Sequence, residues 1–322
     1  MKSLADLKSF LARAWVQGAI PPALLVLLIL IVEIGSPGFL TGETLSLLLS
    51  NTAVLFILAC GVTFVILIGG IDLSIQAVAS LASVIVAQLL PSLGLLAFPV
   101  AIFAGLVFGI LSGVVHVRLK VPSFVATLAT GGVVAGIALW SADGRAITIE
   151  EAGRANTSWI NADVMGMPVV AIMAIIVGLI AFLALRYTRF GRHSIAVGAG
   201  EPAAIAAGIN VNRTKIVAFA VSGTLAAIAG VILAARLSSG SPSLANQLLL
   251  PAIAAVIVGG TAITGGLGGV ARTAVGALII SIVRIGMTFV GVNIFFENVI
   301  FGAVLILAVA ITIDRSKIAI IK

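Results

Sequence analysis

Apolar runs of membrane-spanning length fill almost the whole of this 322-residue chain and leave only short polar segments between them. A helix of about 20 apolar residues crosses the hydrocarbon core of a bilayer. Hydrophobic residues make up 61% of the sequence, charged residues only 9%, and the mean hydropathy is +1.31. A soluble domain of this length has no core large enough to bury so much apolar surface. The sequence therefore predicts an all-α, polytopic membrane protein.

About ten transmembrane helices account for these runs, and they form one domain over residues 18–313. The expected spans are 18–34, 45–68, 73–90, 95–117, 121–141, 168–185, 215–236, 248–263, 270–290 and 296–313. The eighth span is short enough to be a re-entrant segment. Residues 1–17 place Leu4, Leu7 and Leu11 on one helical face, which indicates a helix lying on the membrane surface. The alternative for this segment is a frayed tail, and residues 314–322 form a second tail.

The placement of basic residues predicts that both termini lie in the cytoplasm, because cytoplasmic loops are enriched in Lys and Arg. Segment 186–215 carries five basic residues against one acid, Glu201, whereas segment 143–163 carries two arginines against four acids. Loop 186–215 is therefore expected inside and loop 143–167 outside. The net charge of +7 is then an orientation signal, and nucleic acid is not expected as a partner.

The segment Leu-Ile-Gly-Gly-Ile-Asp-Leu-Ser-Ile-Gln at 67–76 joins the second and third spans. A carboxylate such as Asp72 is costly inside a membrane unless it meets water, backbone N–H groups or a cation. One interpretation is that Asp72 caps a helix starting at Leu73. The other is that the two glycines unwind the helix and that Asp72, Ser74, Gln76 and Ser80 line a translocation path. Such a strip of hydroxyl and amide groups suits a neutral, hydroxylated solute.

A glycine-rich segment at 258–269, Val-Gly-Gly-Thr-Ala-Ile-Thr-Gly-Gly-Leu-Gly-Gly, superficially resembles a phosphate-binding loop. It lacks the Lys-Ser/Thr ending of a nucleotide-binding loop, and the chain contains no Gly-Lys pair. A tight turn between membrane segments, with glycines at positive φ, explains it better. We therefore expect no cofactor and no metal bound by this chain, and no catalytic residues.

Arg284 lies inside the ninth predicted span, where a charge needs a partner or water. We expect it either to face a wet translocation path or to pair with a carboxylate, with Glu297 as a candidate. The single cysteine, Cys60, excludes an internal disulfide and fits a core position.

A short polar segment at 196–210 interrupts the apolar pattern, and Glu201, Pro202 and Gly208 have the positions of helix start and stop signals. They predict a helix of about two turns, beginning with Glu201 as its cap. A helix this short is not stable alone. We expect the membrane domain to hold it so that it fits a groove on another protein.

Several segments together resemble the permease subunits of sugar ABC importers of the ribose, xylose and arabinose type. These permeases share a superfamily with branched-chain amino-acid permeases. The resemblance covers residues 45–315 and rests on the Gly-Val-Thr run at 61–63, 69–74, 119–128, 197–211 and 252–269. It implies about ten helices arranged as in the vitamin B12 importer permease.

The resemblance also implies partners. They are a second permease copy or paralogue, cytoplasmic ATPase subunits that hydrolyse ATP, and a periplasmic sugar-binding protein. Segment 196–210 corresponds to the part of the family that contacts the ATPase. Its coupling residues here are Gly198, Glu201, Ala204, Gly208 and Ile209.

Three positions depart from the family pattern. Gln76 stands where many members have glycine, Leu250 and Pro251 stand where an acidic residue is common, and Ile285-Gly286 replaces a frequent Asn-Gly. We expect these positions near solute contacts, so the cargo and the choice between a homodimer and a heterodimer of permeases stay open. The function implied is import of a pentose, hexose or polyol. The alternatives are an amino acid, nucleoside or sugar-derived signal as cargo, a stand-alone secondary transporter, and an intramembrane enzyme.

Overall fold

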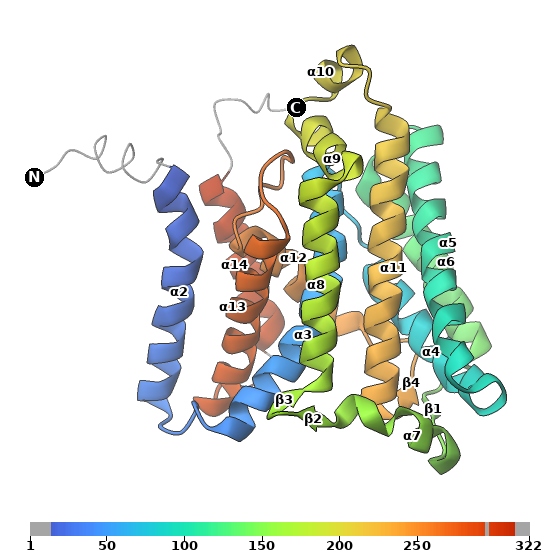
Figure 1. Ribbon diagram of the computed structural model, residues 1–322, viewed down its shortest axis with the longest axis vertical. Helices are drawn as coiled ribbons and strands as arrows, with labels where there is room; N and C mark the ends of the chain where they lie inside the picture. The colour runs from blue at the N-terminus through green and yellow to red at the C-terminus, as the bar shows by residue number, and fades with distance from the viewer. Residues whose placement is uncertain (1–13, 294–295, 313–322) are drawn as a thin grey trace, which may run out of the picture.

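A computed structural model describes residues 14–293 and 296–312, and shows a bundle of long helices capped by short elements at both ends (Figure 1). Helices α9 (Arg189–Ala199) and α10 (Glu201–Ala206) lie at one end, whereas α7 (Glu151–Thr157) and the strands lie at the other. Helix α2 begins and α14 ends at the α9–α10 end (Figure 1). Most of the predicted surface helix at 1–17 and the whole tail at 314–322 lie outside the described residues.

The long helices follow the predicted apolar runs closely. They are α2 Ala14–Gly35, α3 Gly42–Leu67, α4 Ile75–Leu93, α5 Ala97–Arg118, α6 Ser123–Ser141, α8 Val169–Tyr187, α11 Val211–Leu237, α12 Leu249–Val258, α13 Val270–Phe289 and α14 Glu297–Thr312. Six segments in the described part of the chain are long and apolar enough to cross a membrane, and one of them, Ile75–Arg118, contains both α4 and α5. The all-α, multi-pass character is thus confirmed, while the count of ten spans stays a prediction.

Helix α12 is much shorter than its predicted span at 248–263. It has 10 residues, which is about 15 Å of helix and only half of the ~30 Å hydrocarbon core. This length favours the re-entrant interpretation. The glycine-rich segment after it is a turn, as predicted, with positive φ at Gly260, Gly265 and Gly266.

Helix α11 lies at the centre of the main core and packs against α3, α4 and α5. Its contact with α5 is made backbone to backbone through glycines. A Cβ atom at Gly223 would lie 2.3 Å from the carbonyl oxygen of Gly105 and 2.8 Å from the Cα of Gly109. Small residues permit such close approach of membrane helices. Helix α2 packs instead on α13, where Val32 and Ile282 belong to a smaller separate cluster.

The predicted outer loop at 143–167 is ordered and folds over the bundle end. It contains β1 (Ile147–Thr148), α7, η2 (Ser158–Asn161) and β2 (Asp163–Val164). Strand β1 pairs with β4 (Ser239–Gly240), and β2 pairs with β3 (Met167–Pro168), both antiparallel. Buried Ile149 and Ile160 anchor the loop in the core.

The glycine contact between α5 and α11 yields a stability prediction. Gly223→Ala forces two backbones apart, so we expect a loss of about 1–3 kcal/mol in unfolding free energy and a lower melting temperature in detergent. Gly132→Ala on α6 is the matched control, because a Cβ atom there meets nothing within 4 Å. Equal melting temperatures for Gly223→Ala and the control would contradict the close packing.

Candidate solute cavity and coupling helix

The polypeptide leaves helical geometry between α3 and α4. Helix α3 ends at Leu67, Gly69 adopts a φ of +77°, and α4 begins at Ile75. Side chains of α6 accept hydrogen bonds from the N–H groups that have no helical partner in this break. Ile71 N donates to Ser123 Oγ and Leu73 N donates to Thr127 Oγ1, both at 3.0 Å. Buried backbone N–H groups require such protein partners.

Asp72 lies in this break and is almost completely buried, with 1% of its surface exposed. Its Oδ1 accepts hydrogen bonds from Ser74 N at 2.9 Å and Ser74 Oγ at 2.6 Å, and its Oδ2 accepts one from Ser222 Oγ of α11 at 2.7 Å. The expected helix start at Leu73 is wrong, because the N-cap residue is Ser74. Asp72 instead closes a local turn and links the break to α11.

The serines of α4 also bond within the protein. Ser80 Oγ accepts a hydrogen bond from Ala245 N at 3.1 Å, and Ser83 Oγ accepts one from Ser241 N at 3.2 Å. Both serines are buried, and both hold the segment that connects β4 to α12. Ser74, Ser80 and Asp72 therefore face protein partners, whereas Gln76 faces a cavity.

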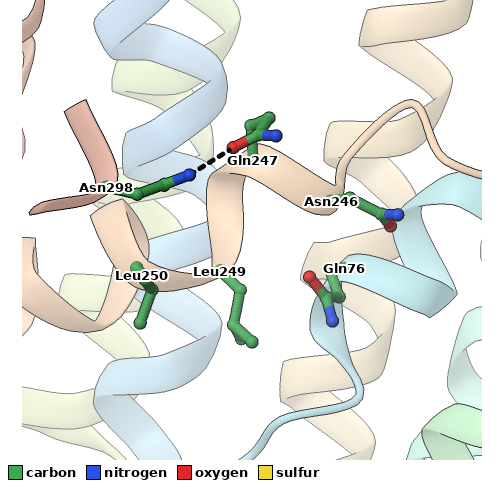
Figure 2. Close-up of a pocket in the computed structure, with 6 residues that line it drawn as sticks. All are labelled: Gln76, Asn246, Gln247, Leu249, Leu250 and Asn298. Atoms are coloured by element: carbon green, nitrogen blue, oxygen red, sulfur yellow. Dashed lines mark hydrogen bonds between the residues drawn. The ribbon is translucent and has the colours of Figure 1, made fainter. Parts of the chain in front are cut away.

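The cavity has a volume of about 520 Å³ and lies where three helices begin. Its lining residues are Gln76, Asn246, Gln247, Leu249, Leu250 and Asn298. In Figure 2, Asn298 and Leu250 lie on one side and Gln76 and Asn246 on the other. Gln76 is near the start of α4, Leu249 and Leu250 begin α12 after the turn η3 (Asn246–Leu248), and Asn298 is near the start of α14.

The side chains that line this cavity are uncharged and combine polar with apolar surface. Four carboxamides supply both donors and acceptors, and two leucines supply apolar surface. Asn298 Nδ2 donates to Gln247 Oε1 at 3.3 Å, which joins α14 to η3 (Figure 2). A solute with hydroxyl groups on an apolar ring is complementary to these residues. Each hydroxyl can donate to and accept from the carboxamides, and the ring carbons can contact the leucines.

Three of these amides were not identified from the sequence. The sequence feature that could have identified them is their position just before or at the start of apolar runs, which applies to Asn246, Gln247 and Asn298. Two of the departures from the family pattern, Gln76 and Leu250, do line the cavity.

Arg284 pairs with a carboxylate, as one interpretation expected. Its Nε lies 2.9 Å from Oε1 of Glu297, and the pair joins α13 to α14. Glu297 is buried and precedes Asn298 of the cavity lining. The pair thereby fixes the start of α14 beside the cavity.

The predicted short helix is present as α10, held by its neighbours. Its N-cap is Gly200 and not Glu201, which occupies the first helical position. Glu201 Oε2 lies 2.7 Å from Lys215 Nζ of α11. At the other end Gly208 has a φ of +77°, and Ile209 N donates to Ala204 O at 3.0 Å, the pattern of a glycine-terminated helix.

Among the five residues predicted to couple to an ATPase, Gly198 is packed most tightly. A Cβ atom there would lie 1.8 Å from Leu67 O and 2.4 Å from Gly266 N. Leu67 O itself accepts a hydrogen bond from Gly266 N at 2.9 Å. Ala204 is buried, while Ile205 of α10 is 59% exposed. Helix α9 therefore touches the end of α3 and the glycine turn at one point, and α10 projects beyond it.

Comparison with known proteins decides the family. The model of the permease component of branched-chain amino acid transport systems matches residues 44–309. The chain belongs to this permease family. The permease is 39% identical to the ribose import permease of Haemophilus influenzae over 290 residues, which cover 88% of this chain and 90% of that protein.

Other relatives agree. The ribose import permease of Bacillus subtilis is 38% identical, with 92% of each chain covered, and the L-arabinose transport system permease of Escherichia coli is 35% identical, with 80% of this chain and 78% of that protein covered. No solved structure gives a significant match. These relatives confirm the resemblance to sugar-importer permeases that was inferred from the sequence motifs.

The link between Asp72 and Ser222 yields a second prediction for the permease. Asp72→Asn replaces one acceptor oxygen by a donor, so we expect a loss of about 1–3 kcal/mol in unfolding free energy. In a double-mutant cycle of Asp72→Ala with Ser222→Ala, the two losses should not add, because both variants remove the Asp72–Ser222 hydrogen bond. Asp143→Asn, at an exposed loop position, is the control. Additive losses from Asp72 and Ser222 would refute the link.

Proposed function

We propose that this permease is the membrane-spanning subunit of an ATP-binding-cassette importer that carries a neutral monosaccharide, a pentose, hexose or related polyol, across the bacterial inner membrane. The observation that carries this proposal is the uncharged, amide-lined cavity between the starts of α4, α12 and α14. Ribose and arabinose permeases at 35–39% identity support the same cargo class.

Transport requires that the cavity open to one side and then to the other. In this proposal Gln76, Asn246 and Asn298 hydrogen-bond the sugar hydroxyls, and the leucines contact its carbon frame. Asp72, Ser74, Ser80 and Arg284 fix the helix breaks around the site. Their bonds within the chain support this role.

The proposed topology has about ten membrane segments in the arrangement of the vitamin B12 importer permease, with both termini and the α9–α10 end in the cytoplasm. Charge supports this orientation. Loop 186–215 at the α9–α10 end is strongly basic, whereas loop 143–167 at the opposite end carries an excess of acids. The outer loop then faces a periplasmic sugar-binding protein.

Energy enters through α10. A cytoplasmic ATPase subunit, which binds and hydrolyses the ATP, contacts the exposed face of α10, and a second permease copy or paralogue completes the membrane core. Movement of α10 passes to α9, and from Gly198 directly to the end of α3 and the glycine turn. The break after α3 leads into α4, and the glycine turn follows α12. Residues of both α4 and α12 line the cavity. Rigid-body movement of this kind alternates access in many transporters.

A charge-reversal experiment tests the coupling helix. Glu201→Lys should abolish ATPase-driven uptake while leaving the chain inserted and folded, because two like charges then face each other between α10 and α11. Uptake is measured in proteoliposomes that contain the complete transporter and its binding protein. The double variant Glu201→Lys/Lys215→Glu restores the ion pair and should recover part of the uptake. Normal uptake by the single variant would refute the coupling role.

Removing one cavity amide tests the solute site. Gln76→Ala should raise the KM for sugar uptake by roughly 3- to 10-fold, the effect of about one hydrogen bond, with little change in the melting temperature. The control is Gln88→Ala, the same change later in α4, where the side chain bonds Ser141 O outside the cavity. Unchanged kinetics for Gln76→Ala would move the solute path elsewhere.

Transport by the isolated chain tests the class of machine. We expect no uptake from vesicles that hold this permease without an ATPase subunit, at any proton or sodium gradient. Uptake driven by such a gradient would show a stand-alone transporter and overturn the proposal.

A further inference from the structure

A second cavity, of about 240 Å³, lies at the α9–α10 end of the bundle, away from the amide-lined cavity. Two arginines line it, Arg186 at the end of α8 and Arg272 in the first turn of α13. Phe182, Leu185 and Ile195 supply an apolar wall. The proposed transport function uses none of these residues.

The two arginines carry charge that the described part of the chain does not neutralise. The ion pairs found there are Lys215–Glu201 and Arg284–Glu297, and neither includes Arg186 or Arg272. Arg272 Nη1 donates a hydrogen bond to Gly260 O at 3.1 Å, which orients the guanidinium group. Its other N–H groups remain available to donate to an anion. A cavity with two such cations favours an anion.

The start of α13 adds neutral donors to the same cavity. Val270 and Ala271 line it, and their N–H groups have no acceptor among the described residues. N–H groups in the first turn of a helix, together with arginines, form a favourable site for phosphate oxygens.

The surface beside the cavity indicates the source of the phosphate. On α8 the residues Ile176, Leu179 and Leu183 are exposed and lie three to four positions apart, so they form an apolar stripe that runs along the helix to Arg186. Exposed Tyr187 follows, as is typical of the membrane–water boundary. Inorganic phosphate has no apolar part that could contact this stripe, whereas the acyl chain of a phospholipid can pack along it.

We propose that this cavity binds the phosphodiester headgroup of an anionic phospholipid, with Arg186, Arg272 and the start of α13 holding the phosphate and the α8 stripe holding an acyl chain. Basic pockets between membrane helices bind such headgroups in other proteins. The lipid would brace α8 against α13 beside the glycine turn.

Native mass spectrometry of the full chain in detergent tests the site, with phosphatidylglycerol and cardiolipin as probes and phosphatidylethanolamine as the zwitterionic comparison. We expect retained anionic lipid, and a roughly tenfold lower affinity in Arg186→Gln/Arg272→Gln. The matched control is Arg189→Gln/Arg213→Gln, which removes the same charge from positions that are exposed, as Arg186 and Arg272 are, but lie outside the cavity. The control should keep its affinity.

Melting temperature supplies a measurement that does not depend on the variants. Phosphatidylglycerol should raise the melting temperature of the unaltered permease, and inorganic phosphate at equal concentration should not. Three results would each overturn the proposal: equal loss of lipid in the control variant, equal stabilisation by inorganic phosphate, and intact lipid binding in Arg186→Gln/Arg272→Gln with loss of ATPase binding. The last would assign the cavity to protein contact.

Discussion

The interrupted backbone between α3 and α4 is the constraint on which the rest of the structure depends. Every buried N–H or C=O group without a partner costs about 1–3 kcal/mol, so the break exists only where the protein replaces water. Ser123 and Thr127 of α6 bind its N–H groups, and Asp72 links it to Ser222 of α11. The central helices thus stabilise a segment that no single helix could hold.

The break gives α4 its position, and α4 gives the cavity one wall. Because α4 begins only at Ile75, its first turn opens toward the first turns of α12 and α14. The starts of three helices then converge on one space, and all the side chains that line it are uncharged. Under the proposed function, the solute site thus offers carboxamide donors and acceptors and no charged side chain.

The sequence predicted the apolar helices and the two glycine-rich breaks well, because both depend on local properties of the chain. It predicted Arg284 with Glu297 because few carboxylates lie near that end of α13. It did not predict that Ser80 binds the segment before α12, since helical periodicity shows which residues share a face but not which neighbour covers it. Ser222 and Asn298 were missed for the same reason, because their partners are distant in sequence. The cap at Gly200 differs by one residue, within the usual uncertainty of helix ends.

Two of the positions that depart from the expected family pattern line the cavity, so their side chains bear on what the cavity can bind. Leu250 stands where an acidic residue is common, and Gln76 stands where glycine is common, and both line the same space. Loss of a carboxylate removes an acceptor that binds hydroxyls strongly, while gain of a carboxamide returns a weaker one that also donates. Under the proposed function, the hydrogen-bonding side chain of this pair of positions lies on α4 and the apolar one on α12.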